Sequence, residues 1–201
     1  MPKQSLHIIY ESKQLVHNDL LDNRGNLLSI IFVHGNLDHS KREEIWSKLR
    51  NLKLSAYPRW LCIGYFNQIF NCDDKFSFNH GSIPGAELFQ EVISDLALCE
   101  LASTSHKFTW MNKRDEEDFV MERIDRAFAS VDWVNAYPNY ALRNLPIIRS
   151  DNGPSSLILS TCNHSEEVLL DLSECGCLIQ LVRIWSNKPG IVIQQGPELF
   201  S

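Results

Sequence analysis

Apolar residues in the first 160 positions fall into short runs separated by turn-forming residues, which is the pattern of a strand-rich domain. The run over residues 27–33 is rich in β-branched side chains, and residues 60–64 are almost continuously apolar. The second run is typical of a strand covered on both faces. Further strands are predicted over residues 6–10, 107–110, 120–129, 141–148 and 156–161.

Two segments have the helical spacing of apolar residues instead. Residues 41–54 place Ile45, Trp46, Leu49 and Leu52 on one face with charges between them, which predicts an amphipathic helix. Residues 85–100 predict a second helix, and residues 131–136 a single helical turn. Strands outnumber helices, so we expect an α+β fold with helices packed outside a sheet sandwich.

The pattern weakens after residue 161. Residues 166–172 predict a short helix, and residues 186–201 have little periodicity and contain two prolines. We therefore expect one domain over residues 1–161 followed by a tail over residues 162–201.

Composition and charge exclude several classes of protein. The 201 residues are 44% hydrophobic with a net charge of −6, which fits a globular protein and not a disordered one. No apolar stretch is long enough for a bilayer and no signal peptide is evident, so we expect an intracellular protein without a membrane partner, nuclear or cytoplasmic. Residues 1–60 carry +3 and the remainder −9, so phosphate contacts would draw on the first third.

Six cysteines in an intracellular protein predict reduced thiols. One cluster also allows a zinc site, with Cys162, His164, Cys175 and Cys177 as ligands. The spacing within its pairs is not the usual one for structural zinc, so free thiols in the tail are the alternative.

Four short phrases occur in a fixed order along the chain. They read GYFN at residues 64–67, FTW at 108–110, ERIDRAF at 122–128 and SDNGP at 150–154. Together they resemble the phrases GDFN, FTW, ERLDRAF and SDHxP of the endonuclease/exonuclease/phosphatase superfamily. The resemblance is greatest to the endonuclease domain of plant LINE-type (non-LTR) retrotransposons, and it covers roughly residues 6–160.

This resemblance implies a four-layered α/β sandwich that cleaves DNA phosphodiesters with a divalent metal, usually Mg²⁺. Such chemistry needs carboxylate oxygens for a hard cation, a base for the attacking water and donors for the developing phosphate charge. The family's metal-binding Glu lies upstream of the region where this chain begins, so the resemblance implies a truncated copy that lacks the first strands. Their loss would leave residues 27–33 at an unpaired sheet edge.

The chain departs from the family pattern at the positions that carry the chemistry. Tyr65 stands where the family has the water-activating Asp, and His34 stands where it has a phosphate-contacting Tyr. Asn152 replaces the histidine of SDH. A phenol, with a pKa of about 10, is neutral at pH 7 and does not act as a carboxylate base.

Three family residues are kept. By resemblance, Asn67 contacts the phosphate, Asp125 orients the histidine of SDH, and Asp151 is a metal or proton-relay carboxylate. Each also has an ordinary structural interpretation: Asn67 and Asp151 as turn residues, and Asp125 as a strand residue paired with Arg123 or Arg126.

The sequence thus favours a degenerate, inactive relic of a retrotransposon endonuclease, with weak DNA affinity, no retained magnesium and no specific protein partner. Two alternatives remain open. One is an active Mg²⁺-dependent phosphodiesterase in which His34 has become the base, and the other is a non-catalytic nucleic-acid-binding module.

Overall fold

The protein divides into two compact units, which are described one at a time. Unit 1 contains Met1–Phe70, Ser82–Leu101 and Asp125–Ala136, and unit 2 contains Asn71–Gly81, Ala102–Ile124 and Tyr137–Ser201. The structure is a computed structural model. It describes residues 7–22, 25–78, 82–112, 114, 116–144, 147, 155–161, 164–171, 180–185 and 191–192.

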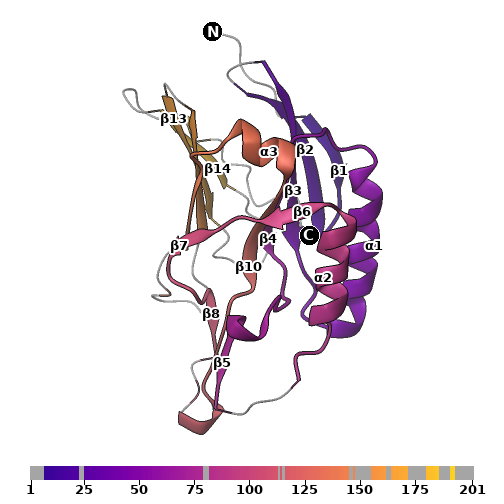
Figure 1. Ribbon diagram of the computed structural model, residues 1–201, viewed down its shortest axis with the longest axis vertical. Helices are drawn as coiled ribbons and strands as arrows, with labels where there is room; N and C mark the ends of the chain where they lie inside the picture. The colour runs from indigo at the N-terminus through magenta and orange to yellow at the C-terminus, as the bar shows by residue number, and fades with distance from the viewer. Residues whose placement is uncertain are drawn as a thin grey trace. The chain divides into compact units, whose positions relative to one another are not determined.

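Unit 1 is built on a six-stranded mixed sheet (Figure 1). Its strands, in spatial order, are β1 (His7–Glu11), β2 (Leu15–Leu21), β3 (Leu27–His34), β4 (Trp60–Tyr65), β10 (Asp125–Ser130) and β6 (Leu98–Glu100). Only β3 and β4 run parallel to each other, and the other neighbouring pairs are antiparallel. The carboxyl ends of β3 and β4 therefore lie at the same edge of the sheet as the amino end of β10.

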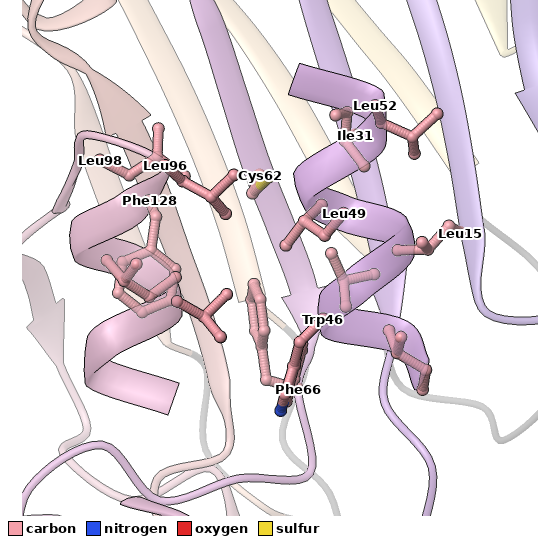
Figure 2. Close-up of a cluster of buried hydrophobic side chains, with 14 of the residues drawn as sticks. Leu15, Ile31, Trp46, Leu49, Leu52, Cys62, Phe66, Leu96, Leu98 and Phe128 are labelled. Atoms are coloured by element: carbon pink, nitrogen blue, oxygen red, sulfur yellow. The ribbon is translucent and has the colours of Figure 1, made fainter. Parts of the chain in front are cut away.

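Two helices cover one face of this sheet and bury its main core (Figures 1 and 2). These are α1 (Arg42–Lys53), which follows the 3₁₀ turn η1 (His39–Lys41), and α2 (Ala86–Asp95). Trp46 of α1 stacks on Phe89 of α2 with ring centroids 4.8 Å apart, and Phe66 lies 5.4 Å from Phe89. The apolar faces of α1 and α2 that the helical spacing predicts are thus buried against each other and against the sheet.

Unit 2 contains two further sheets. The smaller has the order β5 (Lys75–Ser77), β9 (Val120–Glu122) and β8 (Trp110–Met111). The larger has the order β15 (Ile191–Val192), β14 (Gln180–Trp185), β13 (His164–Asp171), β12 (Ser155–Thr161), β11 (Ala141–Asn144) and β7 (Ser103–Ser105). The remaining helical elements are η2 (Cys72–Asp74) and η3 (Glu116–Asp118) in unit 2 and α3 (Val131–Ala136) in unit 1.

Most predicted elements are confirmed, and four expectations are wrong. Of the strand predicted over residues 107–110, only Trp110 lies in a strand, β8. The run at residues 27–33 is not at a sheet edge, because β3 pairs with β2 on one side and β4 on the other. The helix predicted over residues 166–172 is the strand β13, which pairs with β12 and β14. The single strand predicted over residues 120–129 is two strands, because the chain leaves one sheet at Glu122 and enters another at Asp125.

The division of the chain at residue 161 stays a prediction, although β12 and β13 lie on either side of it as neighbours in one sheet. In the part of the chain that the structure describes, no helix has the length and apolar character needed to cross a membrane.

Candidate functional site

Three of the residues singled out from the sequence form a row across the edge of the unit 1 sheet. His34 ends β3, Tyr65 ends β4 and Asp125 begins β10, and the strand register places His34 beside Tyr65 and Tyr65 opposite Asp125. Residues in register on neighbouring strands point to the same face of a sheet. We call His34, Tyr65 and Asp125 the tip row.

The tip row lies on the face of the sheet that faces away from α1 and α2. Val33 and Cys62 of the adjoining strands belong to the core beneath the helices, and side chains alternate along a strand. Val33 faces this core, so the side chain of His34, the next residue along β3, lies on the opposite face of the sheet. Tyr65 and Asp125 share its side through the register.

His34 and Tyr65 contact each other as an aromatic pair. Their ring centroids are 5.8 Å apart with an angle of 24° between the planes, which is a stacked arrangement. Partial burial lowers the pKa of the His34 imidazole from its ordinary value, because desolvation disfavours the charged ring. His34 is therefore neutral at pH 7 and retains a nitrogen that can accept a proton.

Asp125, the member of the tip row on β10, is buried, with 2% of its surface exposed. The two arginines on either side of it have other carboxylates as partners. Arg123 lies 3.8 Å from a carboxylate oxygen of Asp74, and the buried Arg126 forms an ion pair with the partly exposed Glu100. The pairing of Asp125 with one of these arginines, which the sequence suggested as its ordinary role, stays a prediction.

Asn67 follows β4 and stabilises the turn at the strand tips. Its side-chain amide donates a hydrogen bond of 2.6 Å to the carbonyl of Gly35, while the Gly35 N–H donates to the carbonyl of Tyr65. Asn67 is 8% exposed and has a φ of 55°, a left-handed conformation that Asn tolerates better than most residues. The amide that the resemblance assigns to phosphate contact therefore donates to the protein backbone.

Close backbone packing explains the two glycines at these tips. A Cβ atom at Gly35 would overlap the carbonyl of Phe66, and one at Gly64 would overlap the carbonyl of Val33. Gly64 also has a φ of +148°, which L-residues with a side chain rarely adopt. The positions of His34 and Tyr65 are thus fixed by backbone contacts between β3 and β4.

Arg42 and Gln68 also hold the loops around the site, and the sequence interpretation missed both. Arg42 donates to the carbonyls of Asn36 and Leu37 and, through Nη1, to Oε1 of Gln68 at 2.8 Å. Gln68 is buried and donates to the carbonyl of Pro84. The only signal in the sequence was the position of these residues, because Gln68 directly follows Asn67 and Arg42 lies in the first turn of the predicted helix.

In unit 2, the FTW and ERIDRAF phrases meet in the smaller sheet. Trp110 pairs in register with Glu122, and the Ile124 N–H donates to the hydroxyl of Thr109 at 3.1 Å. The two phrases therefore stabilise each other's backbone. Asp125 follows directly, as the first residue of β10.

The described residues do not form a magnesium site on their own. Mg²⁺ takes oxygen ligands, and within the tip row only Asp125 supplies a carboxylate. Across the described ranges, no three His, Cys, Asp or Glu side chains are grouped so as to hold a metal ion. Asp151 and Asn152 lie outside the described residues, as do Cys162, Cys175 and Cys177 of the zinc alternative.

Comparisons with known proteins identify relatives of the fold. No family model matches the chain, and no curated protein matches it. Among solved structures, the endonuclease domain of TRAS1, a telomere-specific non-LTR retrotransposon, matches with a TM-score of 0.60 at 13% identity, over 79% of this chain and 70% of that one. The 3′ phosphatase NExo from Neisseria, bound to a product DNA hairpin, matches with a TM-score of 0.55 at 15% identity, over 78% and 70%.

These two neighbours are a nuclease domain and a phosphatase, and both have the architecture that the four sequence phrases implied. At 13% and 15% identity, the likeness establishes the fold but not the chemistry of the site, which depends on the residues present there. The α+β sandwich predicted from the sequence is confirmed, and the chain shares the fold of these two structures.

Proposed function

We propose that this chain is a divergent retrotransposon endonuclease domain, of the plant LINE type, that binds DNA weakly and does not cleave it. The tip row is the observation that carries the proposal. Tyr65 occupies the central position of that row, between His34 and Asp125, where the resembling family has the aspartate that activates water.

Hydrolysis of a phosphodiester requires a base for the attacking water and positive charge near the phosphate. A phenol is protonated at pH 7 and is a poor substitute for a carboxylate base. The loss of a positioned base lowers the rate by about 10²–10⁴-fold. Among the described residues of the site, only Asp125 offers Mg²⁺ a carboxylate, so both requirements favour an inactive site.

DNA is the proposed ligand because the structural neighbours are an endonuclease domain and a phosphatase bound to a DNA hairpin. The net charge of −6 limits the affinity, because phosphate contacts supply most non-specific binding. We expect a Kd of roughly 10⁻⁴ M or weaker for duplex DNA at physiological salt.

The test is nicking of supercoiled plasmid in Mg²⁺ or Mn²⁺, with EDTA and heat-denatured protein as controls. We expect no nicked product above the denatured control. EDTA-sensitive nicking that Asp125→Asn abolishes, and that Asp132→Asn at an exposed position in α3 leaves unchanged, would overturn the proposal. Fluorescence anisotropy with labelled duplex measures the affinity, and a sub-micromolar Kd would favour a binding module instead.

A second candidate is supported by the state of His34. Its neutral ring beside Tyr65 has the protonation required of a general base. In this case nicking would be present, would increase with pH as His34 loses its proton, and would disappear in His34→Ala. His39→Ala, at an exposed position in the following turn, is the matched control and should retain activity.

A further inference from the structure

Two connecting segments meet the tip row at the edge of the unit 1 sheet. The turn between β1 and β2, over residues 12–14, lies next to His34, because the His34 N–H donates to the Gln14 carbonyl at 2.7 Å. The connection from β3 to α1, over residues 35–41, continues directly from His34. Residues of both segments are therefore neighbours of the tip row.

Hydrogen bonds fix the shape of both segments. In the turn, the Ser12 N–H donates to the Leu15 carbonyl at 2.8 Å, and the Ser12 hydroxyl accepts from the Leu15 N–H at 3.0 Å. In the connection from β3 to α1, Arg42 donates to the carbonyls of Asn36 and Leu37 at 2.8 and 3.0 Å. A ligand that binds to these segments needs little further ordering of the protein, which favours binding.

Three exposed side chains of different chemistry lie at this edge. The His34 ring is exposed although it stacks on Tyr65, with 5.8 Å between the ring centroids. Leu37 is 73% exposed, and Lys13 is also exposed. Among the residues that the structure describes, the Lys13 ammonium has no ion partner and no hydrogen-bond acceptor. We call His34, Leu37 and Lys13 the tip surface.

The charge at this edge is nearly balanced, so attraction to phosphate alone is weak. The two segments carry two basic residues and one acidic residue, a net charge of +1. Lys41 and Asp38 pair with each other at 3.5 Å, so Lys13 is the cation of these segments that remains for a ligand. Glu11, which precedes the turn, is exposed and reduces the attraction further. One such cation neutralises one phosphate and not the row of phosphates along a duplex.

This combination suits single-stranded DNA better than duplex DNA. In a duplex, neighbouring bases cover each base face, and protein contacts go mostly to the phosphates. In a single strand the base faces are open, and stacking on aromatic side chains supplies affinity without regard to sequence. The His34 ring and Leu37 offer contacts of this kind, and Lys13 offers a phosphate contact.

We infer that the tip surface binds single-stranded DNA in preference to duplex DNA. One base stacks on the His34 ring, a neighbouring base packs on Leu37, and a phosphate of the same strand contacts Lys13. The inference rests on the proposed function, because it names the form of DNA that the same site takes.

The test compares fluorescein-labelled oligothymidine with a labelled duplex of the same length, by anisotropy with the full chain at one salt concentration. All samples contain EDTA, so the result does not depend on whether the protein is a metal-dependent nuclease. We expect a Kd for oligothymidine at least about tenfold lower than the Kd for the duplex, since each stacked base contributes to binding.

Two variants of His34 test the stacking contact. His34→Ala should weaken the binding of oligothymidine at least about fivefold, because one base loses its aromatic partner. His34→Phe keeps a ring at this position and should bind within about twofold of the wild type. Circular dichroism checks that each variant is folded.

Two further variants, each with a matched control, test the other contacts. Lys13→Gln should lower the slope of log Kd against log salt by about 0.7, the value for one phosphate contact on a single strand. Lys48→Gln removes the same charge from α1, on the opposite face of the sheet, and should leave the slope unchanged. Leu37→Ser should weaken binding at least about threefold through lost apolar contact, whereas Leu54→Ser, 87% exposed at the end of α1, should not.

Three outcomes would overturn the inference. One is a duplex Kd equal to or lower than the Kd for oligothymidine, and another is equal binding of oligothymidine by the wild type and His34→Ala. The third is an equal change of salt slope in Lys13→Gln and Lys48→Gln, which would make the attraction a general effect of charge. Metal-dependent nicking of plasmid would instead overturn the proposed function, and the preference measured in EDTA would stand apart from it.

Discussion

Replacing Asn67 with Ala tests whether this side chain serves to hold the strand tips together. In the structure its amide donates to the Gly35 carbonyl at 2.6 Å, and both groups lie next to the tip row. We expect the variant to be clearly destabilised, because Ala removes the donor and also fits poorly at a φ of 55°.

The magnitude follows from two contributions. A buried carbonyl that loses its donor costs about 1–3 kcal/mol. The left-handed backbone costs Ala roughly 1 kcal/mol more than it costs Asn. The sum, about 2–4 kcal/mol, is a large part of a typical stability of about 5–15 kcal/mol, and at about 2–4 °C per kcal/mol it lowers the Tm by roughly 4–16 °C.

The assay is urea unfolding followed by tryptophan fluorescence, which reports on the buried Trp46 and Trp60 of unit 1. Asn67→Gly removes the same bond but accepts the backbone conformation, so we expect it to lose about 1–3 kcal/mol. Asn51→Ala, at an exposed position of α1, is the matched control and should change stability by less than about 0.5 kcal/mol. A similarly small change for Asn67→Ala would refute the reasoning.

Three other predictions concern packing around the same sheet. Gly64→Ala should destabilise unit 1 by at least about 3 kcal/mol, because its Cβ would overlap the Val33 carbonyl. The control Gly25→Ala has open space around its Cβ and should lose only about 1 kcal/mol, so equal losses in urea unfolding would argue against this packing. Burial raises the pKa of the Cys62 thiol, so iodoacetamide should label Cys72 and Cys99 in the folded protein and spare Cys62 until urea is added, as mass spectrometry can show. Glu100→Ala removes the carboxylate partner of buried Arg126 and should cost about 2–4 kcal/mol, more than Arg126→Met; the reverse order in urea unfolding would contradict the pairing.

The helices of unit 1 could be predicted because their apolar residues repeat at helical spacing and fill one core. Ile45, Trp46, Leu49 and Leu52 are all buried in α1, and the predicted bounds of the helix differ from the observed ones by one residue at each end. The strand β2 was missed because His17, Asn18 and Asp19 interrupt its apolar pattern. His17 and Asn18 are nevertheless buried, and Asp19 accepts hydrogen bonds from His17 and from Ser29 of the neighbouring strand.

The candidate site could be predicted in part. Two of the phrases identified Tyr65 and Asp125, the family's phosphate-contacting Tyr position identified His34, and the strand register brings these three together. The role of Asn67 could not be read from the sequence, because a donor to phosphate and a donor to a backbone carbonyl require the same residue at the same turn. Arg42 was equally hidden, since its three acceptors come from loops whose approach only the folded chain defines.

The position of β10 affects how the protein folds during synthesis. This strand lies between β4 and β6 in the sheet, yet it begins about 60 residues after β4 ends. At about 5–20 residues per second, a ribosome needs roughly 3–12 s to make that stretch. During this time the buried edge of β4, with Leu61 and Ile63, has no strand to pair with. A nascent chain that has passed residue 65 but not residue 130 should therefore be a preferred client of ribosome-associated chaperones.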